Sequence, residues 1–92
     1  MLIFRPTTQF KKDYKLAKKR GYDISLLEEV IDKLLREIPL EEKYKDHALI
    51  GNYLGFRECH IQSDWLLIYA INHDKLILTA SRTGTHSDLL RK

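Results

Sequence analysis

The chain has 92 residues, of which 43% are hydrophobic and 32% are charged, and its formal net charge is +3 with a pI near 9.0. This composition is typical of one small globular domain and excludes a disordered chain, a second domain and a large internal cofactor cavity. The longest apolar run, 65–71, is too short to cross a bilayer, no secretory signal pattern is present, and the single cysteine, Cys59, cannot form an intramolecular disulfide. We therefore expect one domain over residues 1–92, located in the cytoplasm and without membrane contact.

The N-terminal region predicts a strand followed by an amphipathic helix. A short β-prone run, 2–4, precedes Thr7 and Thr8, either of which can cap a following helix. Apolar residues then recur at helical spacing over 9–20, and Gly21 favours the left-handed conformation that ends helices. The outward face of this helix is basic: Lys11, Lys12, Lys15, Lys18, Lys19 and Arg20. Such a run is most often only a solvated face, but it also suits a polyanionic or acidic partner.

A second helix is predicted directly after the first. Ser25 and Glu28 have the spacing of a capping box, in which the serine accepts from a helical amide and the glutamate reaches back. An apolar stripe then keeps a period of 3.6 until Pro39 ends it. The stripe consists of Leu27, Val30, Ile31, Leu34, Leu35 and Ile38. Because only 21–24 separate the two helices, we expect them to form an antiparallel hairpin.

The second half of the chain predicts a loop and three strands. Residues 39–52 lack a sustained period and are expected to form a loop. The β-prone segments 53–61, 64–71 and 76–82 are joined by short polar linkers, which favours an antiparallel meander. The resulting order, β-α-α-β-β-β, is an α+β fold in which a two-helix hairpin packs on one face of an antiparallel sheet, with a short C-terminal helical turn as an optional last element.

Polar residues gather where these predicted strands begin and end. Alternation along the first strand of the meander puts Glu58 and His60 on one face, and Asp64 follows in the next turn. Antiparallel pairing would bring Arg82, at the end of the third strand, to the same sheet edge, with His86 just beyond it. We expect His60 and Asp64 to form a pair; the alternative is a histidine and an aspartate that only stabilise a hairpin.

This set of side chains suits phosphate chemistry. Imidazoles can remove and return protons, and a guanidinium can neutralise the charge that builds on phosphorus. RNA supplies its own nucleophile, because a 2′-hydroxyl can attack the adjacent phosphate and leave a 2′,3′-cyclic phosphate and a 5′-hydroxyl. The competing hypothesis is a zinc site made from His47, His60, Asp64 and His86. We disfavour it, and expect no metal and no cofactor, because the spacing matches no compact zinc motif. The remaining histidine, His73, lies in a predicted turn and is expected to be exposed.

Several motifs resemble a known family when they are taken together. They are YKDH at 44–47 with Leu49 and Gly51, GFRECH at 55–60, DWLLIY at 64–69 and RTGTH at 82–86. In order and spacing they resemble the YafQ branch of the RelE/ParE toxin superfamily, over essentially the whole chain. The resemblance implies a toxin of a type II toxin–antitoxin system: a metal-independent, ribosome-dependent mRNA endoribonuclease that inhibits translation and is silenced by a co-expressed, DinJ-like antitoxin.

The resemblance also implies roles for individual residues. The catalytic set would be His47, His60, His86, Asp64, Glu58 and Arg82. In this set His86 is the general acid, Arg82 holds the scissile phosphate and Asp64 orients, while the base is either His47 or His60. The expected RNA contacts are Lys11, Lys12, Lys15, Lys18, Lys19, Arg20, Lys45, Arg57 and Arg82, with the basic helix on ribosomal RNA. If the loop 39–52 places His47 elsewhere, two histidines must perform both proton transfers.

Two features leave alternatives open. Some relatives carry an aromatic residue shortly after the last histidine, where this chain has Leu89 and Leu90, so codon preference is not predicted. A ParE-like toxin that binds a topoisomerase without cleaving RNA would share the fold. A catalytically inactive protein that only serves the antitoxin in autoregulation is a third hypothesis. The gathering of histidines favours the ribonuclease over both.

Overall fold

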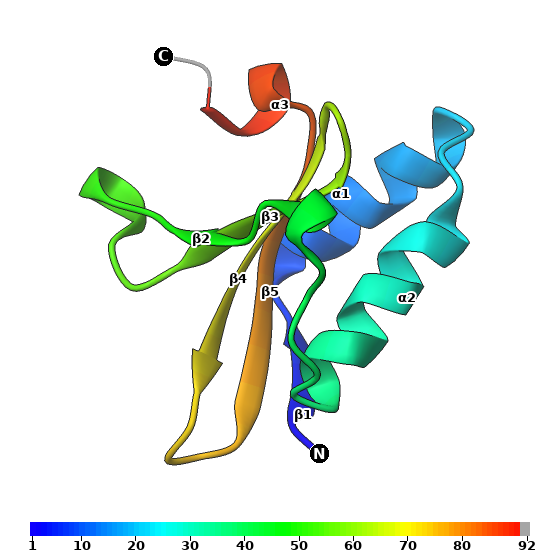
Figure 1. Cartoon of the computed structure of the whole chain (residues 1–92). Coiled ribbons are helices and arrows are strands. Elements are labelled where there is room, and N and C mark those ends of the chain that lie inside the picture. Colours follow the sequence, from blue (N-terminus) through cyan, green and yellow to red (C-terminus); the bar gives the residue numbers. More distant parts are fainter. Residues whose placement is uncertain (91–92) are drawn as a thin grey trace.

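The computed structural model of the chain describes residues 1–90, and for Leu90 only the backbone, so 91–92 of the predicted domain lie outside it (Figure 1). The strands are β1 (Ile3–Pro6), β2 (His47–Ala48), β3 (Arg57–Gln62), β4 (Trp65–Asn72) and β5 (Ile77–Gly84). The helices are α1 (Thr8–Lys19), α2 (Ile24–Leu35) and α3 (His86–Leu90), with 3₁₀ turns η1 (Glu42–Tyr44) and η2 (Gly51–Tyr53). The α+β prediction is confirmed, including the short C-terminal helix. Within the described part, none of the helices has the length and apolar character needed to span a bilayer.

The strands form one sheet in the order β1-β5-β4-β3-β2. The meander β3-β4-β5 is antiparallel, as predicted, whereas β1 pairs parallel with β5 in the register Ile3 to Ile77. The long connection that a parallel pair requires is the chain between β1 and β5, which includes the helix hairpin and the strands β2, β3 and β4. The prediction of a plain loop over 39–52 is wrong, because this segment contains η1, β2 and the first part of η2. Such elements are too short to produce a visible period in the sequence.

The helix starts show one correct and one wrong prediction. Thr7 caps α1, its hydroxyl oxygen accepting from the Phe10 amide at 3.0 Å. The N-cap of α2 is Asp23, whose carboxylate accepts from the Ser25 amide at 3.1 Å, so the capping box predicted at Ser25 is wrong. The glutamate of that box, Glu28, instead accepts a hydrogen bond from Tyr14 on α1 at 3.3 Å. A tertiary contact therefore takes the side chain that the local motif required.

The second helix ends before the predicted stop. Its last residue is Leu35, and Glu37 has a left-handed backbone conformation with φ 58°. The amide of Ile38 donates to the Lys33 carbonyl at 2.9 Å and that of Glu37 to the Leu34 carbonyl at 3.0 Å, which is a Schellman motif. Ile38 therefore lies outside the helix and is exposed, although the sequence placed it in the apolar stripe.

Two apolar clusters hold the layers together. The larger one lies between the helix hairpin and one sheet face and includes Phe10, Leu27, Trp65 and Tyr69. The smaller one covers the opposite face, where Leu66, Ile68 and Leu89 pack with Leu49, Tyr53 and Phe56. Figure 1 shows α3 beyond the upper end of the sheet, on the same side of the molecule as the segment that joins β2 to β3. The small cluster therefore ties α3 to the sheet and positions the residue at its start, His86.

Candidate active site

A buried carboxylate lies between two histidines. The β2–β3 pairing puts His47 directly opposite Glu58. The Nε2 atom of His47 lies 3.5 Å from Glu58 Oε1, and that of His60 lies 3.9 Å from the same oxygen. The Glu58 side chain is 5% exposed, and its Oε2 atom has no hydrogen-bond partner within residues 1–90. The sequence left open whether His47 reaches the site, and β2 answers that it does.

The backbone at Lys45 fixes the His47 ring. Its carbonyl oxygen lies 2.7 Å from His47 Nδ1, and because a carbonyl can only accept, Nδ1 carries the proton. Lys45 has φ 49°, a left-handed conformation that is uncommon for a residue with a side chain. The ring therefore turns its Nε2 atom toward Glu58.

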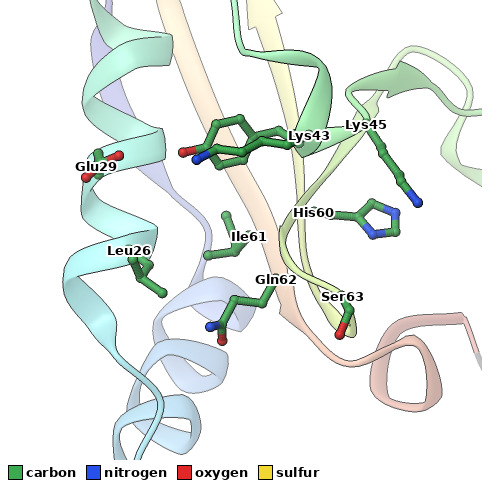
Figure 2. A pocket seen from close by; sticks show the side chains of 9 residues that line it. Leu26, Glu29, Lys43, Lys45, His60, Ile61, Gln62 and Ser63 are labelled. Carbon is green, nitrogen blue, oxygen red and sulfur yellow. The ribbon is translucent and has the colours of Figure 1, made fainter.

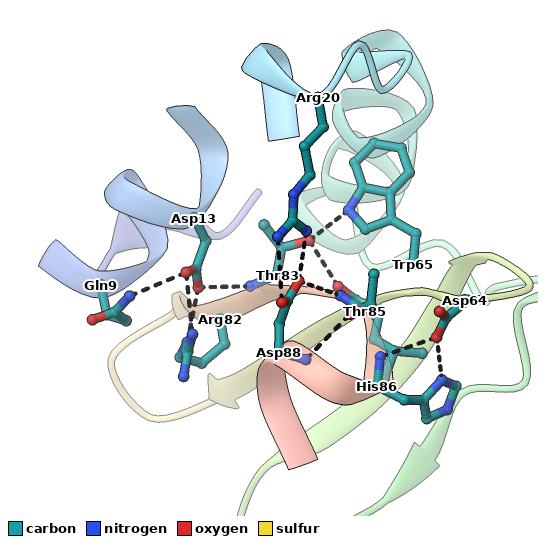
Figure 3. A network of polar contacts seen from close by, with 11 residues as sticks. Gln9, Asp13, Arg20, Asp64, Trp65, Arg82, Thr83, Thr85, His86 and Asp88 are labelled. Carbon is teal, nitrogen blue, oxygen red and sulfur yellow. Dashed lines mark hydrogen bonds and ion pairs between the residues drawn. The ribbon is translucent and has the colours of Figure 1, made fainter. Parts of the chain in front are cut away.

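Asp64 holds His86 at two points. The His86 ring Nδ1 lies 2.6 Å from Asp64 Oδ1, and the His86 amide donates to the same oxygen at 3.0 Å (Figure 3). The amide hydrogen bond and then the ring hydrogen bond lower the pKa of Asp64. The predicted pairing of Asp64 with His60 is wrong, because α3 begins with its first amide directed at this carboxylate. Instead, the His60 and His86 rings meet edge to face, with centroids 5.6 Å apart.

A capping box that sequence reasoning missed sets the start of α3. The Thr85 amide donates to Asp88 Oδ2 at 3.0 Å, and the Asp88 amide donates to the Thr85 hydroxyl at 3.1 Å. Arg20, at the end of α1, donates to Asp88 at 2.7 Å. Hydrogen bonds from Arg20 and then from the Thr85 amide lower the pKa of Asp88 to about 2. The sequence signal was Thr-x-x-Asp before two leucines.

Arg82 lies in an ion pair with a residue that the sequence analysis did not single out. Its Nε and Nη2 atoms lie 2.8 and 3.2 Å from the two carboxylate oxygens of Asp13 on α1 (Figure 3). Asp13 is nearly buried and also accepts from the Thr83 amide and the Gln9 side chain. The hydrogen bond to Asp13 raises the pKa of Arg82. The only hint in the sequence was an acid alone among the lysines of this helix.

The register corrects the expected position of Arg82. We predicted it at the level of His60, but Arg82 pairs with Ile68, which pairs with Glu58 on the other side. Gly84 is the residue that shares the row of His60, through Leu66. A register shift between Ile68 and Tyr69 adds a residue to β5, and sequence alternation does not reveal such a shift.

The predicted RNA contacts differ in whether their side chains are exposed or paired with an acidic residue. The lysines of α1 are exposed, and Lys18 lies 5.9 Å above the Tyr14 ring. Arg57 is paired with Asp46, both contacts at 3.3 Å, and Asp46 also accepts from the Tyr69 hydroxyl at 2.6 Å. Arg57 therefore has a structural partner, whereas Lys45 is exposed at the edge of a cleft beside His60.

Some residues of the site are also close enough together to bind a metal ion. They are not the same set as the zinc ligands considered from the sequence. The ligand atoms of Glu58, His60 and His86 all lie within 4.8 Å of one another. Among the described residues, neither His47 nor Asp64 belongs to this group. Two imidazoles and a carboxylate suit zinc or copper, and the unpaired Glu58 oxygen is available to such an ion.

Comparison with known proteins identifies the family. Residues 2–91 match the family described as bacterial toxin of type II toxin-antitoxin system, YafQ. The mRNA interferase toxin YafQ of Escherichia coli K12 is 45% identical over 82 residues, which cover 88% of this chain and 87% of that protein. The E. coli DinJ–YafQ complex contains a chain with a TM-score of 0.88 and 38% identity, covering 97% of this chain and 98% of that one. A metal-bound toxin from Helicobacter pylori has a TM-score of 0.91 and 44% identity, with 97% and 99% coverage. These matches decide against the ParE-like alternative, and the chain belongs to the YafQ family of type II toxin–antitoxin toxins.

Proposed function

We propose that this chain is an mRNA interferase that cleaves ribosome-bound mRNA in the cytoplasm. The 2′-hydroxyl attacks the adjacent phosphate, leaving a 2′,3′-cyclic phosphate and a 5′-hydroxyl end. The observation that carries the proposal is the edge-to-face pair of His60 and His86, with Asp64 hydrogen-bonded to the second ring. Two imidazoles in contact can serve opposite proton transfers at one phosphate. The names of the E. coli relatives support the same activity.

In this mechanism His86 is the general acid. Its Nδ1 proton is committed to Asp64, so Nε2 is the atom that gives a proton to the leaving 5′-oxygen. The carboxylate of Asp64 stabilises the charged ring before the transfer. Because Asp64 has a lowered pKa, it remains ionised at neutral pH and can stabilise the charged His86 ring there.

His60 is the base that removes the 2′-hydroxyl proton. It is the imidazole next to His86, whereas His47 uses one ring nitrogen for the Lys45 carbonyl and turns the other toward Glu58. Oε1 of the buried Glu58 carboxylate lies 3.9 Å from His60 Nε2, so the two groups are close enough to interact during the proton transfer. His47 Nε2 lies 3.5 Å from the same oxygen, on its other side.

Arg82 neutralises charge on the phosphate. The ion pair with Asp13 uses Nε and Nη2, which leaves Nη1 for a phosphate oxygen. The exposed lysines of α1 contact ribosomal RNA as point charges. A DinJ-like antitoxin is the partner that silences the toxin, as the complexes of E. coli YafQ with DinJ suggest.

The test is mRNA cleavage with and without ribosomes, comparing wild type, His86→Ala and His73→Ala with the cut ends mapped. His73 is the matched control, because it is an exposed histidine in the turn after β4. We expect ribosome-dependent cutting that falls at least about a hundredfold in His86→Ala, the scale of a lost acid, and is unchanged in His73→Ala. A folded wild type that arrests growth without cutting mRNA would overturn the proposal. A folded wild type that neither cuts mRNA nor arrests growth would also overturn it and would favour the catalytically inactive protein that only serves the antitoxin.

A second property, metal binding at the same residues, is favoured by the ligand geometry and by the metal-bound toxins of H. pylori. Glu58, His60 and His86 would hold a zinc or copper ion, which would supply a Lewis acid at the site. Because the ion would occupy the nitrogens that exchange protons, we expect added Zn²⁺ or Cu²⁺ to lower the cleavage rate and EDTA to restore it. Cleavage that is abolished by EDTA would contradict a metal-independent reaction.

A further inference from the structure

A cleft of about 490 Å³ opens beside His60 and has no role in the mechanism described above. It lies between α2, η1 and the end of β3 (Figure 2). Leu26 and Ile61 supply apolar walls, while Gln62 and Ser63 supply an amide and a hydroxyl. A cleft with an apolar floor and a few polar groups is the usual form of a site for a small organic group.

The cleft is continuous with the candidate active site. β2 pairs only with Arg57 and Glu58, so the edge of β3 from Cys59 onward has no neighbouring strand within the described residues. His60 lies on this edge, with His86 against its ring and the cleft beside it. A phosphate held between the two imidazoles therefore has one of its flanking nucleotides next to the cleft.

Lys45 connects the cleft to the catalytic histidines. It has a left-handed backbone, and strain of this kind is often kept at functional sites. Its carbonyl oxygen holds the His47 ring, and its side chain lies beside His60, with which it lines one end of the cleft (Figure 2). One residue thus orients a catalytic imidazole and presents a cation to whatever enters.

The charges at the mouth suit an anion. Lys33 is paired with Glu41 at 3.3 Å, but Lys43 and Lys45 form no ion pair within residues 1–90. The lining acid, Glu29, lies on the opposite wall, on α2 (Figure 2). A lysine can pair with a phosphate, and the Gln62 amide offers both a donor and an acceptor to the edge of a base.

We propose that this cleft is a subsite for the nucleotide next to the scissile phosphate of single-stranded RNA. Lys45 contacts its phosphate, and Gln62 reads the edge of its base. The inference rests on the proposed ribonuclease function and adds to it a determinant of base preference at one position flanking the cut.

The binding experiment uses the full chain labelled with ¹⁵N and a hexanucleotide RNA carrying 2′-O-methyl groups, which cannot supply the attacking hydroxyl. The side-chain amide of Asn72, exposed at the end of β4, is an internal control for Gln62. We expect the side-chain amide signals of Gln62 to shift and those of Asn72 to stay. Lys45→Ala should weaken binding severalfold and reduce the salt slope of log K by about 0.7, the value for one phosphate contact with a single strand. Lys75→Ala, in the exposed turn before β5, should change neither.

The cleavage experiment maps the cuts made by wild type and Gln62→Ala on ribosome-bound mRNA. We expect Gln62→Ala still to cut but to lose base preference at one flanking position. If wild type cuts while the Gln62 signals stay unmoved, or if Lys45→Ala matches Lys75→Ala, the subsite is wrong and the proposed function stands. If the Gln62 signals shift but wild type does not cut, the cleft binds RNA, but the proposed function is wrong and so is the assignment of the cleft to a nucleotide beside a cut.

Discussion

Removing the contact between Asp64 and His86 should affect the cleavage rate but not the stability of the fold. Asp64 is exposed and bonds both the amide and the ring of His86. We expect Asp64→Asn to lower the cleavage rate at least about tenfold, because an amide cannot balance the charge of the imidazolium. The melting temperature should change by no more than a degree or two, since an exposed contact contributes little to stability. Asp74→Asn, an exposed acid in the turn after β4, should have no effect on either measurement.

Residue type and spacing were enough to predict that Glu58, His60, Asp64 and His86 gather at one place. Alternation correctly put Glu58 and His60 on one face, because a period of two survives in any regular strand. Asp13 was not found, because its partner Arg82 lies 69 positions away and nothing local distinguishes a buried acid from a solvated one. The pairing of Asp64 with His86 depends on where α3 begins, which is a tertiary property.

At the scale of elements, the end of α2 carries backbone strain that one substitution can remove. Glu37 adopts φ 58°, a conformation that costs about 1–2 kcal/mol for a residue with a side chain. Glycine would avoid this cost, but its greater freedom in the unfolded chain would offset about 0.5–1 kcal/mol of the stabilisation. We expect Glu37→Gly to stabilise the protein by about 0.5–1 kcal/mol and to raise its melting temperature by a few degrees.

The matched control is Glu29→Gly, inside the same helix, which should destabilise by about 1 kcal/mol because the position is helical. Thermal and denaturant unfolding measure both changes. A lower stability for Glu37→Gly would mean that its exposed contact with His73, at 3.8 Å, matters more than the strain.

The elements themselves were predictable in proportion to their length. Segments with several periods, such as α2 and β4, were found from their apolar patterns. The two residues of β2 carry no period, and the parallel partner of β1 is set by the crossover rather than by its own sequence. The capping box at Thr85 could have been recognised from its Thr-x-x-Asp spacing, but a five-residue helix is too short to show an apolar repeat that would predict it.

At the scale of the whole molecule, the ion pair between Arg20 and Asp88 ties the first helix to the last one. The pKa of Asp88 falls from its ordinary value of 3.8 to about 2 in the folded protein. A lowered pKa means that the carboxylate stabilises the fold above about pH 4 and that this contribution is lost as the pH falls toward 2. We expect Asp88→Asn to be less stable than wild type by at most about 2 kcal/mol at pH 7.

The measurement is unfolding of both proteins from pH 7 down to pH 2. The difference between their free energies of unfolding should be constant at neutral pH and should disappear between about pH 4 and pH 2. A gap that persists at the lowest pH would show that the asparagine harms packing at Gly84, which Asp88 contacts closely, rather than the charge interaction.

The pairing of β1 with β5 also bears on how the protein is made. Residues 3–6 leave the ribosome early, yet their partners are 77–80, and Thr7 bonds Ser81 while Asp13 bonds Arg82. Contacts between residues so distant in sequence form late in folding. A nascent or truncated chain that stops before β5 has neither a partner for its first strand nor a His86. Under the proposed function, we therefore expect a chain to become able to cleave mRNA only after nearly the whole described length has been synthesised.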